Sequence, residues 1–311
     1  MLIQQGTLPF TSHSGTGPQK EEQTVNFPRP ANNVVALLSG FEVEFVDDER
    51  PLHLMEIDLN TRNLSNQAIE ITGSLGLRDR SNVWDDTYRG HIRYAVIGSE
   101  ANSELLGGTL LFPSQDGAGP FTLSENIQYA ERIEASASLL TGFKARYSTD
   151  DENLLELQVD LNSQMPSTNQ MQISGAYGLR DNSGNWDNRY DGTIHYSGIG
   201  IRRSIDPGGN TPQIRTGSIE FDFHSGSGPR EESMRISFDR PIGNCIAALT
   251  GFLVGFDSSD DHPVHKVIIN VEARKMSNTE VEVVGSLGLR DNSNHWDDRY
   301  RGSIRFAVIA E

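Results

Sequence analysis

The sequence predicts an all-β protein made of three tandem six-stranded antiparallel β-sandwich domains. Three observations carry this prediction. One stretch of sequence recurs three times, apolar and polar residues alternate along its short apolar runs, and no long segment repeats its apolar residues every 3.6 positions. Each repeat holds about six such runs with turn residues between them, which is typical of a small antiparallel sandwich.

Three tryptophans, the only ones in the chain, anchor the repeat. Trp84, Trp186 and Trp296 each lie 11 positions after a glycine, and a Gly-Leu-Arg-Asp segment precedes each of them. The tryptophans are 102 and 110 residues apart, and most of the extra residues fall in a polar segment rich in Gly and Pro. We therefore expect domains at 1–98, 99–202 and 203–311, with 203–212 as a linker.

Six short apolar runs define the strands expected in the first domain. Charged residues occupy alternate positions in the run Phe41-Glu42-Val43-Glu44-Phe45, as expected for a strand with one buried face. A loop with Gly and Pro follows the first run, and the tryptophan segment joins the fifth run to the sixth. The expected strands are 6–10, 24–27, 34–45, 52–59, 68–77 and 90–97. The first strand recurs at 108–112 and 217–221, and the last at 192–199 and 302–309.

Charge and hydropathy exclude two classes of partner. Acidic residues exceed basic ones by 43 to 26, which gives a net charge of −17 and repels phosphate backbones and anionic lipids. We therefore expect no nucleic-acid partner. No apolar run approaches the roughly 18 residues of a membrane span, and the first residues lack a secretory signal, so we expect no membrane insertion and either an intracellular or a processed protein. The single cysteine, Cys245, is expected to be a buried, inert thiol.

The segment around each tryptophan is the strongest candidate for a site. In the first domain it contains Arg78, Asp79, Ser81, Trp84 and the two aspartates that follow, in an expected hairpin loop of about ten residues. Three hypotheses fit these residues: the loop stabilises itself through Asx-type turns, it binds a hard cation such as Ca²⁺, or it presents an aromatic face and fixed polar groups to a sugar. Calcium is the weakest hypothesis, and its candidate ligands are Asp79, Asp86, Asp181, Asp291 and Asp298.

A second repeated element follows the first strand. His13 and His224 each open a His-Ser-Gly-x-Gly-Pro segment, and Gln115 and Asp116 stand at the corresponding place in the middle domain. A tight Gly/Pro loop is the simpler interpretation, and histidines that line a site are the functional one. No nucleophile, base and orienting acid recur together, so we do not expect an enzyme.

The repeat unit resembles the H-type lectins of invertebrates, whose relatives include the C-terminal domains of discoidins. The resemblance rests on the run Val34-Val-Ala-Leu-Leu-Ser-Gly-Phe-Glu-Val and on the Trp-Asp-Asp-x-Tyr segment that leads into Ile92-Arg-Tyr-Ala-Val-Ile. It implies six-stranded sandwiches that assemble as a parallel trimer, with galactose or N-acetylgalactosamine-type sugars bound between neighbouring subunits. Three units in one chain would then form an intrachain pseudo-trimer.

The resemblance also implies the sugar-binding residues. They are the hairpin tryptophan, the residue after it and the loop after the first strand. The family's arginine in the fourth strand has no counterpart here, and the arginine of the Gly-Leu-Arg-Asp segment is a candidate to replace it. The implied sites are Trp84, Asp85, Arg78 and His13; Trp186, Asp187, Arg180 and Asp116; and Trp296, Asp297, Arg290 and His224.

The sequence therefore predicts a non-enzymatic, trivalent carbohydrate-binding protein whose partners are glycans or glycoconjugates, with no cofactor except the weak possibility of Ca²⁺. The alternative is a structural or assembly protein that uses the sandwich repeats as a rigid interaction block. The first prediction implies a monomeric pseudo-trimer, and the second implies a component of a larger homo-oligomer.

Overall fold

The computed structural model describes residues 1–15, 17–31, 33–46, 52–79, 81, 83–84, 86–99, 103–116, 119–148, 154–181, 186, 189–202, 211–225, 228–257, 264–291, 293, 295–296 and 298–311. These residues form 18 β-strands and no helix, so the all-β prediction is confirmed. The described part of the chain accordingly has no helix that is long and apolar enough to cross a membrane.

Each repeat contributes six strands, which we call a unit. Unit 1 consists of β1 (Leu2–Ser14), β2 (Gln19–Asn26), β3 (Val34–Phe45), β4 (Leu52–Ser65), β5 (Ala68–Asp79) and β6 (Thr87–Gly98). Unit 2 consists of β7 (Ser103–Asp116), β8 (Phe121–Gln128), β9 (Ile133–Tyr147), β10 (Leu154–Ser167), β11 (Gln170–Asp181) and β12 (Arg189–Arg202). Unit 3 consists of β13 (Gln213–Ser225), β14 (Arg230–Ser237), β15 (Cys245–Phe256), β16 (Val264–Lys275), β17 (Glu280–Asp291) and β18 (Arg299–Ala310). Most strands extend beyond the predicted apolar runs because the hydrogen-bonded ladders continue into polar residues.

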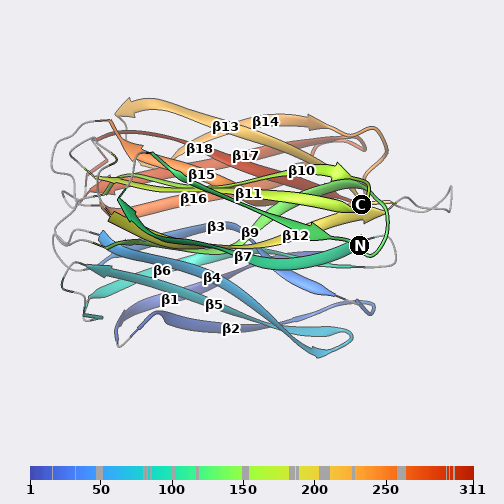
Figure 1. Ribbon diagram of the computed structural model, residues 1–311, viewed down its shortest axis with the longest axis horizontal. Helices are drawn as coiled ribbons and strands as arrows, with labels where there is room; N and C mark the ends of the chain where they lie inside the picture. The colour runs from blue at the N-terminus through green and yellow to red at the C-terminus, as the bar shows by residue number, and fades with distance from the viewer. Residues whose placement is uncertain are drawn as a thin grey trace.

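The strands form three six-stranded antiparallel sheets, and every sheet combines three strands from each of two units. The orders are β1-β6-β3-β16-β17-β14, β13-β18-β15-β10-β11-β8 and β2-β5-β4-β9-β12-β7. The units therefore join edge to edge at three boundaries: 1/2 (β4 with β9), 2/3 (β10 with β15) and 3/1 (β16 with β3). Since each unit pairs with both others, the chain closes into a ring, as the pseudo-trimer prediction required. The two termini lie side by side (Figure 1), and the Met1 amino group lies 3.0 Å from Glu311 Oε2.

The repeated Gly-Phe pair has a physical reason in this ring. Phe41, Phe143 and Phe252 are fully buried and pack against one another with ring centroids 5.3–5.5 Å apart, so one phenylalanine from each unit meets at the pseudo-threefold axis. The preceding glycines allow the neighbouring unit to approach. A Cβ on Gly142 would clash with Asp58 Oδ1 and lie only 2.8 Å from the Ile57 carbonyl oxygen.

A second apolar cluster lies near the start of β1 and the end of β18, and it also contains residues of all three units. Its members are fully or almost fully buried. They include Leu37, Ile97, Leu139, Ile199, Ala248 and Ile309. Cys245 packs against the main core and is half-buried, less than the fully buried thiol that the sequence predicted; burial raises the pKa of this thiol.

Candidate functional site

Each predicted tryptophan is partly buried and packs against an arginine of its own unit. The guanidinium carbon of Arg78 lies 5.4 Å from the centroid of the Trp84 ring, and the equivalent distances are 5.6 Å for Arg180 with Trp186 and 5.5 Å for Arg290 with Trp296. These are cation–π distances. The arginine and tryptophan of each predicted site are therefore brought together in all three units.

A glycine two residues before each arginine provides the space for the indole ring. A Cβ on Gly76 would lie 3.1 Å from both Trp84 and Pro18, and a Cβ on Gly178 or Gly288 would lie 2.7 Å from Trp186 or 3.1 Å from Trp296. Because residues i and i+2 of a strand share a face, the glycine and the arginine contact the same ring. The ring is thus held between a strand, a loop proline and a guanidinium group.

The tryptophan segment is also tied to the loop after the first strand. Tyr88, four residues after Trp84, donates its hydroxyl hydrogen to the carbonyl oxygen of Gly17 at 3.0 Å. The equivalent bonds run from Tyr190 to Gly119 at 2.8 Å and from Tyr300 to Gly228 at 2.9 Å. The two sequence elements predicted to form one site therefore meet in every unit.

Three hairpin aspartates accept hydrogen bonds from backbone amides of their own loops. Asp79 Oδ1 accepts the Ser81 amide at 2.9 Å, and Asp86 Oδ2 accepts the Asp79 amide at 3.0 Å. Asp291 Oδ1 accepts the Ser293 amide at 2.9 Å in the same way. The bonds to the Ser81 and Ser293 amides are the Asx-type turns of the self-stabilising hypothesis, and the bond accepted by Asp86 closes the hairpin across seven residues.

The other proposed calcium ligands are distributed in the same loops. Asp181 is buried at the end of β11, and Asp298 is half-buried just before β18. Within the described residues, no three His, Cys, Asp or Glu side chains lie close enough together to hold a metal ion.

Some predicted site residues are placed only in part. Asp85, Asp187 and Asp297, the residues after the tryptophans, lie outside the described residues. His13, Asp116 and His224 lie near or at the ends of β1, β7 and β13, where the strand register sets them opposite Tyr88, Arg189 and Tyr300. The structure also shortens the expected hairpin loop, because the arginine and the following aspartate belong to the strand.

The three arginines that pack on the tryptophans, Arg78, Arg180 and Arg290, each begin a row of residues that crosses a unit boundary. Strand register aligns one residue from each of four adjacent strands, two in each unit. Every row carries more positive than negative formal charge, in a chain whose net charge is −17. The rows are Arg78, Leu54, Arg146 and Asp191 at the 1/2 boundary; Arg180, Glu156, Gly255 and Arg301 at the 2/3 boundary; and Arg290, Lys266, Glu44 and Arg89 at the 3/1 boundary.

At two boundaries a buried glutamate neutralises part of this charge. Glu156 accepts a hydrogen bond from Arg180 at 2.6 Å and another from Arg301 of unit 3 at 3.3 Å. Glu44 lies 2.9 Å from Lys266 Nζ and 3.4 Å from Arg290, and it also pairs with Arg89. Burial alone would raise the pKa of Glu44, but the hydrogen bonds from Lys266 and Arg89 outweigh it and lower the pKa.

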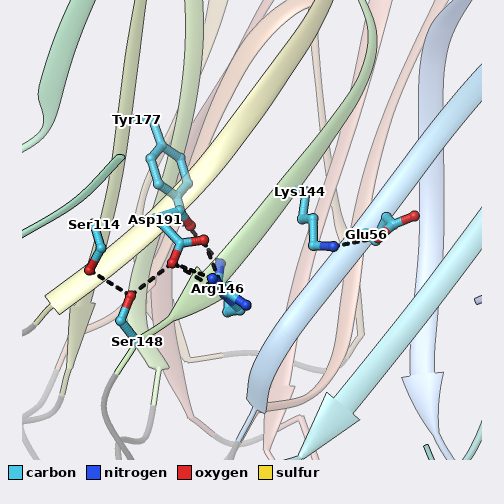
Figure 2. Close-up of polar contacts among 7 residues, drawn as sticks. All are labelled: Glu56, Ser114, Lys144, Arg146, Ser148, Tyr177 and Asp191. Carbon is cyan, nitrogen blue, oxygen red and sulfur yellow. Dashed lines mark hydrogen bonds and ion pairs between the residues drawn. The ribbon is translucent and has the colours of Figure 1, made fainter. Parts of the chain in front are cut away.

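The 1/2 boundary has a different arrangement (Figure 2). Arg146 donates to both carboxylate oxygens of Asp191, at 2.7 Å from Nη2 and 3.0 Å from Nε, and Ser148 donates to the same carboxylate at 2.8 Å. The Tyr177 hydroxyl donates to the Asp191 carbonyl oxygen at 2.8 Å. Burial raises the pKa of Tyr177 well above its usual range, so this hydroxyl stays protonated. The result is a rigid bidentate pair at the boundary.

Unit 1 contributes Glu56 and Arg78 to the charges at this boundary. The Glu56 carboxylate forms an ion pair with Lys144 of unit 2 at 3.2 Å (Figure 2). Burial, and after it the like charge of Arg146 across the boundary, lowers the pKa of Arg78. Beside Arg146 and Asp191 the surface is hollowed by about 490 Å³, and the hollow is lined also by Lys144, Thr193 and the chain from Leu111 to Ser114.

Sequence reasoning missed Glu56, Lys144, Arg146 and Asp191. They differ between the three repeats, so a comparison of the repeats gives no signal for them. Their outward positions in alternating strands could be predicted, but their meeting at one boundary depends on the pairing of β4 with β9.

No known family model, curated protein or solved structure matches this chain.

Proposed function

We propose that this protein is a non-enzymatic carbohydrate-binding protein with three glycan sites, one at the tryptophan end of each unit boundary. One observation carries the proposal: the closed ring repeats the same tryptophan and arginine pair three times, each beside a row of charged residues that continues into the next unit.

The local chemistry is suited to sugars. An aromatic ring packs on the C–H surface of a sugar, while fixed polar groups bind its hydroxyls. Here the indole is held by a glycine and a proline, and guanidinium and carboxylate groups are fixed by mutual hydrogen bonds. A site held in this way loses little conformational entropy on binding. The resemblance to H-type lectins favours galactose or N-acetylgalactosamine-type glycans.

The ring also explains why three units occupy one chain. Equivalent residues of a pseudo-threefold ring lie at the same level along its axis, so the three tryptophan ends face the same way. If one glycan-bearing surface engages all three, avidity exceeds single-site affinity by about 10²–10⁴.

A glycan array, run with and without EDTA, tests the proposal. We expect binding to galactose or N-acetylgalactosamine-type glycans that persists in EDTA. The triple variant Trp84→Ala, Trp186→Ala and Trp296→Ala should lose this binding while its far-ultraviolet circular dichroism remains that of a β-protein. Arg274→Gln, which removes an exposed ion pair with Glu272 away from the tryptophans, is the matched control. Silence of the folded protein across the array, or full binding by the triple variant, would refute the proposal.

A second function, a structural block in a larger assembly, is favoured by one observation. The tryptophan ring is already packed by its own arginine, glycine and proline, and the hairpin aspartates bond to their own backbone. Size-exclusion chromatography with light scattering separates the two functions. A self-sufficient ring has the chain mass of 34.4 kDa, and an assembly component has a larger one.

A further inference from the structure

A second set of hollows lies on the unit boundaries, farther along the strands from the tryptophans. Their volumes are about 420 Å³ at the 1/2 boundary, 310 Å³ at the 2/3 boundary and 240 Å³ at the 3/1 boundary. Equivalent residues line all three, including a glycine of the first strand and a hydroxyl residue of the third. These are Gly108 and Thr141, Gly217 and Thr250, and Gly6 and Ser39. We call them the boundary grooves.

One register position distinguishes the three grooves. At this position a polar residue of one unit and a basic residue of the next flank the glycine before the axial phenylalanine. The pairs are Asp58 and His195 at 1/2, Asp160 and Arg305 at 2/3, and Asn270 and Arg93 at 3/1. An acid thus faces an imidazole in one groove and a guanidinium in the second, whereas an amide faces a guanidinium in the third.

These pairs leave the grooves with different charge. Asp160 forms an ion pair with Arg305, so each neutralises the other. Among the described residues Asp58 has no ion-pair partner, and both nitrogens of the His195 ring contact threonine hydroxyls instead. The His195 Nδ1 lies 2.9 Å from the Thr109 hydroxyl oxygen, and the His195 Nε2 lies 3.5 Å from the Thr193 hydroxyl oxygen.

The Asp58 carboxylate is held in a fixed position. Its Oδ2 accepts a hydrogen bond from Asn60 at 2.6 Å, and its Oδ1 lies against Gly142, where no side chain intervenes. Burial raises the pKa of Asp58, and His195 only partly offsets this effect. A bound cation would compensate the half-buried charge. The rest of the groove offers hydroxyl and amide groups, from Asn60, Thr61, Thr109, Thr141 and Ser197.

We propose that the groove at the 1/2 boundary binds a small hydroxylated molecule that carries a protonated amine, such as an amino sugar with a free amino group. The amine pairs with the Asp58 carboxylate, and the hydroxyls bind the threonine, serine and asparagine side chains around it. The net charge of −17 adds a general attraction for cations. The site shares no residue with the tryptophan ends, so it does not rest on the glycan-binding function proposed above.

Nuclear magnetic resonance titration of the full chain tests this proposal, with glucosamine as the probe and N-acetylglucosamine as its uncharged counterpart. At pH 7 we expect glucosamine to shift the amide signals of Thr109, Thr141 and Ser197. N-acetylglucosamine should bind at least about tenfold more weakly, because a hydrogen bond to a charged group is lost. Equal affinity for the two sugars, or shifts confined to the tryptophan ends, would overturn the proposal.

Variants that copy the other grooves use side chains that the same register position already carries elsewhere in this chain, and they sharpen the test. Asp58→Asn copies the amide of the 3/1 groove, and His195→Arg copies the guanidinium of the 2/3 groove. Both should weaken glucosamine binding at least about tenfold, the first by removing the charge and the second by neutralising it. Arg305→His is the reciprocal change, and it should add a second site with shifts around Ser218 and Thr250. If both 1/2 variants bind as the parent protein does, the proposal is wrong, whatever the glycan array shows.

Discussion

Truncation of Phe143 to alanine tests whether the three units form one folding unit. The ring is fully buried, and its centroid lies 5.5 Å from that of Phe41 and 5.3 Å from that of Phe252. A Phe→Ala change in a core costs about 3–5 kcal/mol, and each aromatic pair contributes about 0.5–1.5 kcal/mol of this beyond the buried area. We therefore expect Phe143→Ala to lower the free energy of unfolding by about 4 kcal/mol.

The same substitution should leave unfolding cooperative, because every sheet crosses a unit boundary. Urea unfolding followed by circular dichroism and by tryptophan fluorescence should give one coincident transition, with a tryptophan in each unit reporting on it. If the three units unfolded independently, the substitution would instead remove the transition of one unit and leave the transitions of the others unchanged.

A double-mutant cycle makes the test quantitative. Phe143→Ala with Phe252→Ala should show a coupling energy of about 1 kcal/mol, since the two rings touch. Phe10→Ala is the matched control, because Phe10 is equally buried but packs within unit 1 near Gly73. Its effect should add to that of Phe143→Ala within about 0.5 kcal/mol. Additive behaviour of the axial pair, or separate transitions for the two probes, would refute the ring as a single folding unit.

Three further predictions concern ionisable and hydrogen-bonding groups. Glu44→Gln should lower the free energy of unfolding by about 2 kcal/mol at pH 7, the size of a hydrogen bond to a charged group. The pKa of Glu44 is lowered by folding, so its contribution is present above the ordinary carboxyl range and is lost as the pH falls through its folded pKa; denaturation curves of parent and variant should converge in acid. Folding raises the pKa of Asp58, so the ionised carboxylate destabilises the folded protein and Asp58→Asn should be more stable than the parent at pH 7. This difference in stability should shrink as the pH falls through the folded pKa of Asp58. An unchanged difference at pH 4 would count against the assignment. Tyr190→Phe removes the bond to the Gly119 carbonyl and should cost about 1 kcal/mol in urea unfolding, whereas no measurable cost would mean that this tether does not stabilise the hairpin.

The sequence by itself determined the strands and the repeat. Alternation of apolar and polar residues is a local property, because side chains of a strand point to opposite faces with a period of two. The run 34–45 was therefore predicted with the bounds that β3 has in the structure, and the other strands of unit 1 at the right places. The tryptophans and their arginines were found because they recur, and recurrence needs no knowledge of the fold.

Only the tertiary structure decided which edges pair. The sheets join strands far apart in the chain, such as β3 with β16, and the alternation within each strand is compatible with many partners. The close approach at glycine and the meeting of three phenylalanines at one axis select these pairings. Arg146, Asp191 and His195 lie on these boundaries and differ between repeats, and Asp58 recurs only as Asp160. Their neighbours, and with them the charge of each groove, follow from long-range packing that no local pattern encodes.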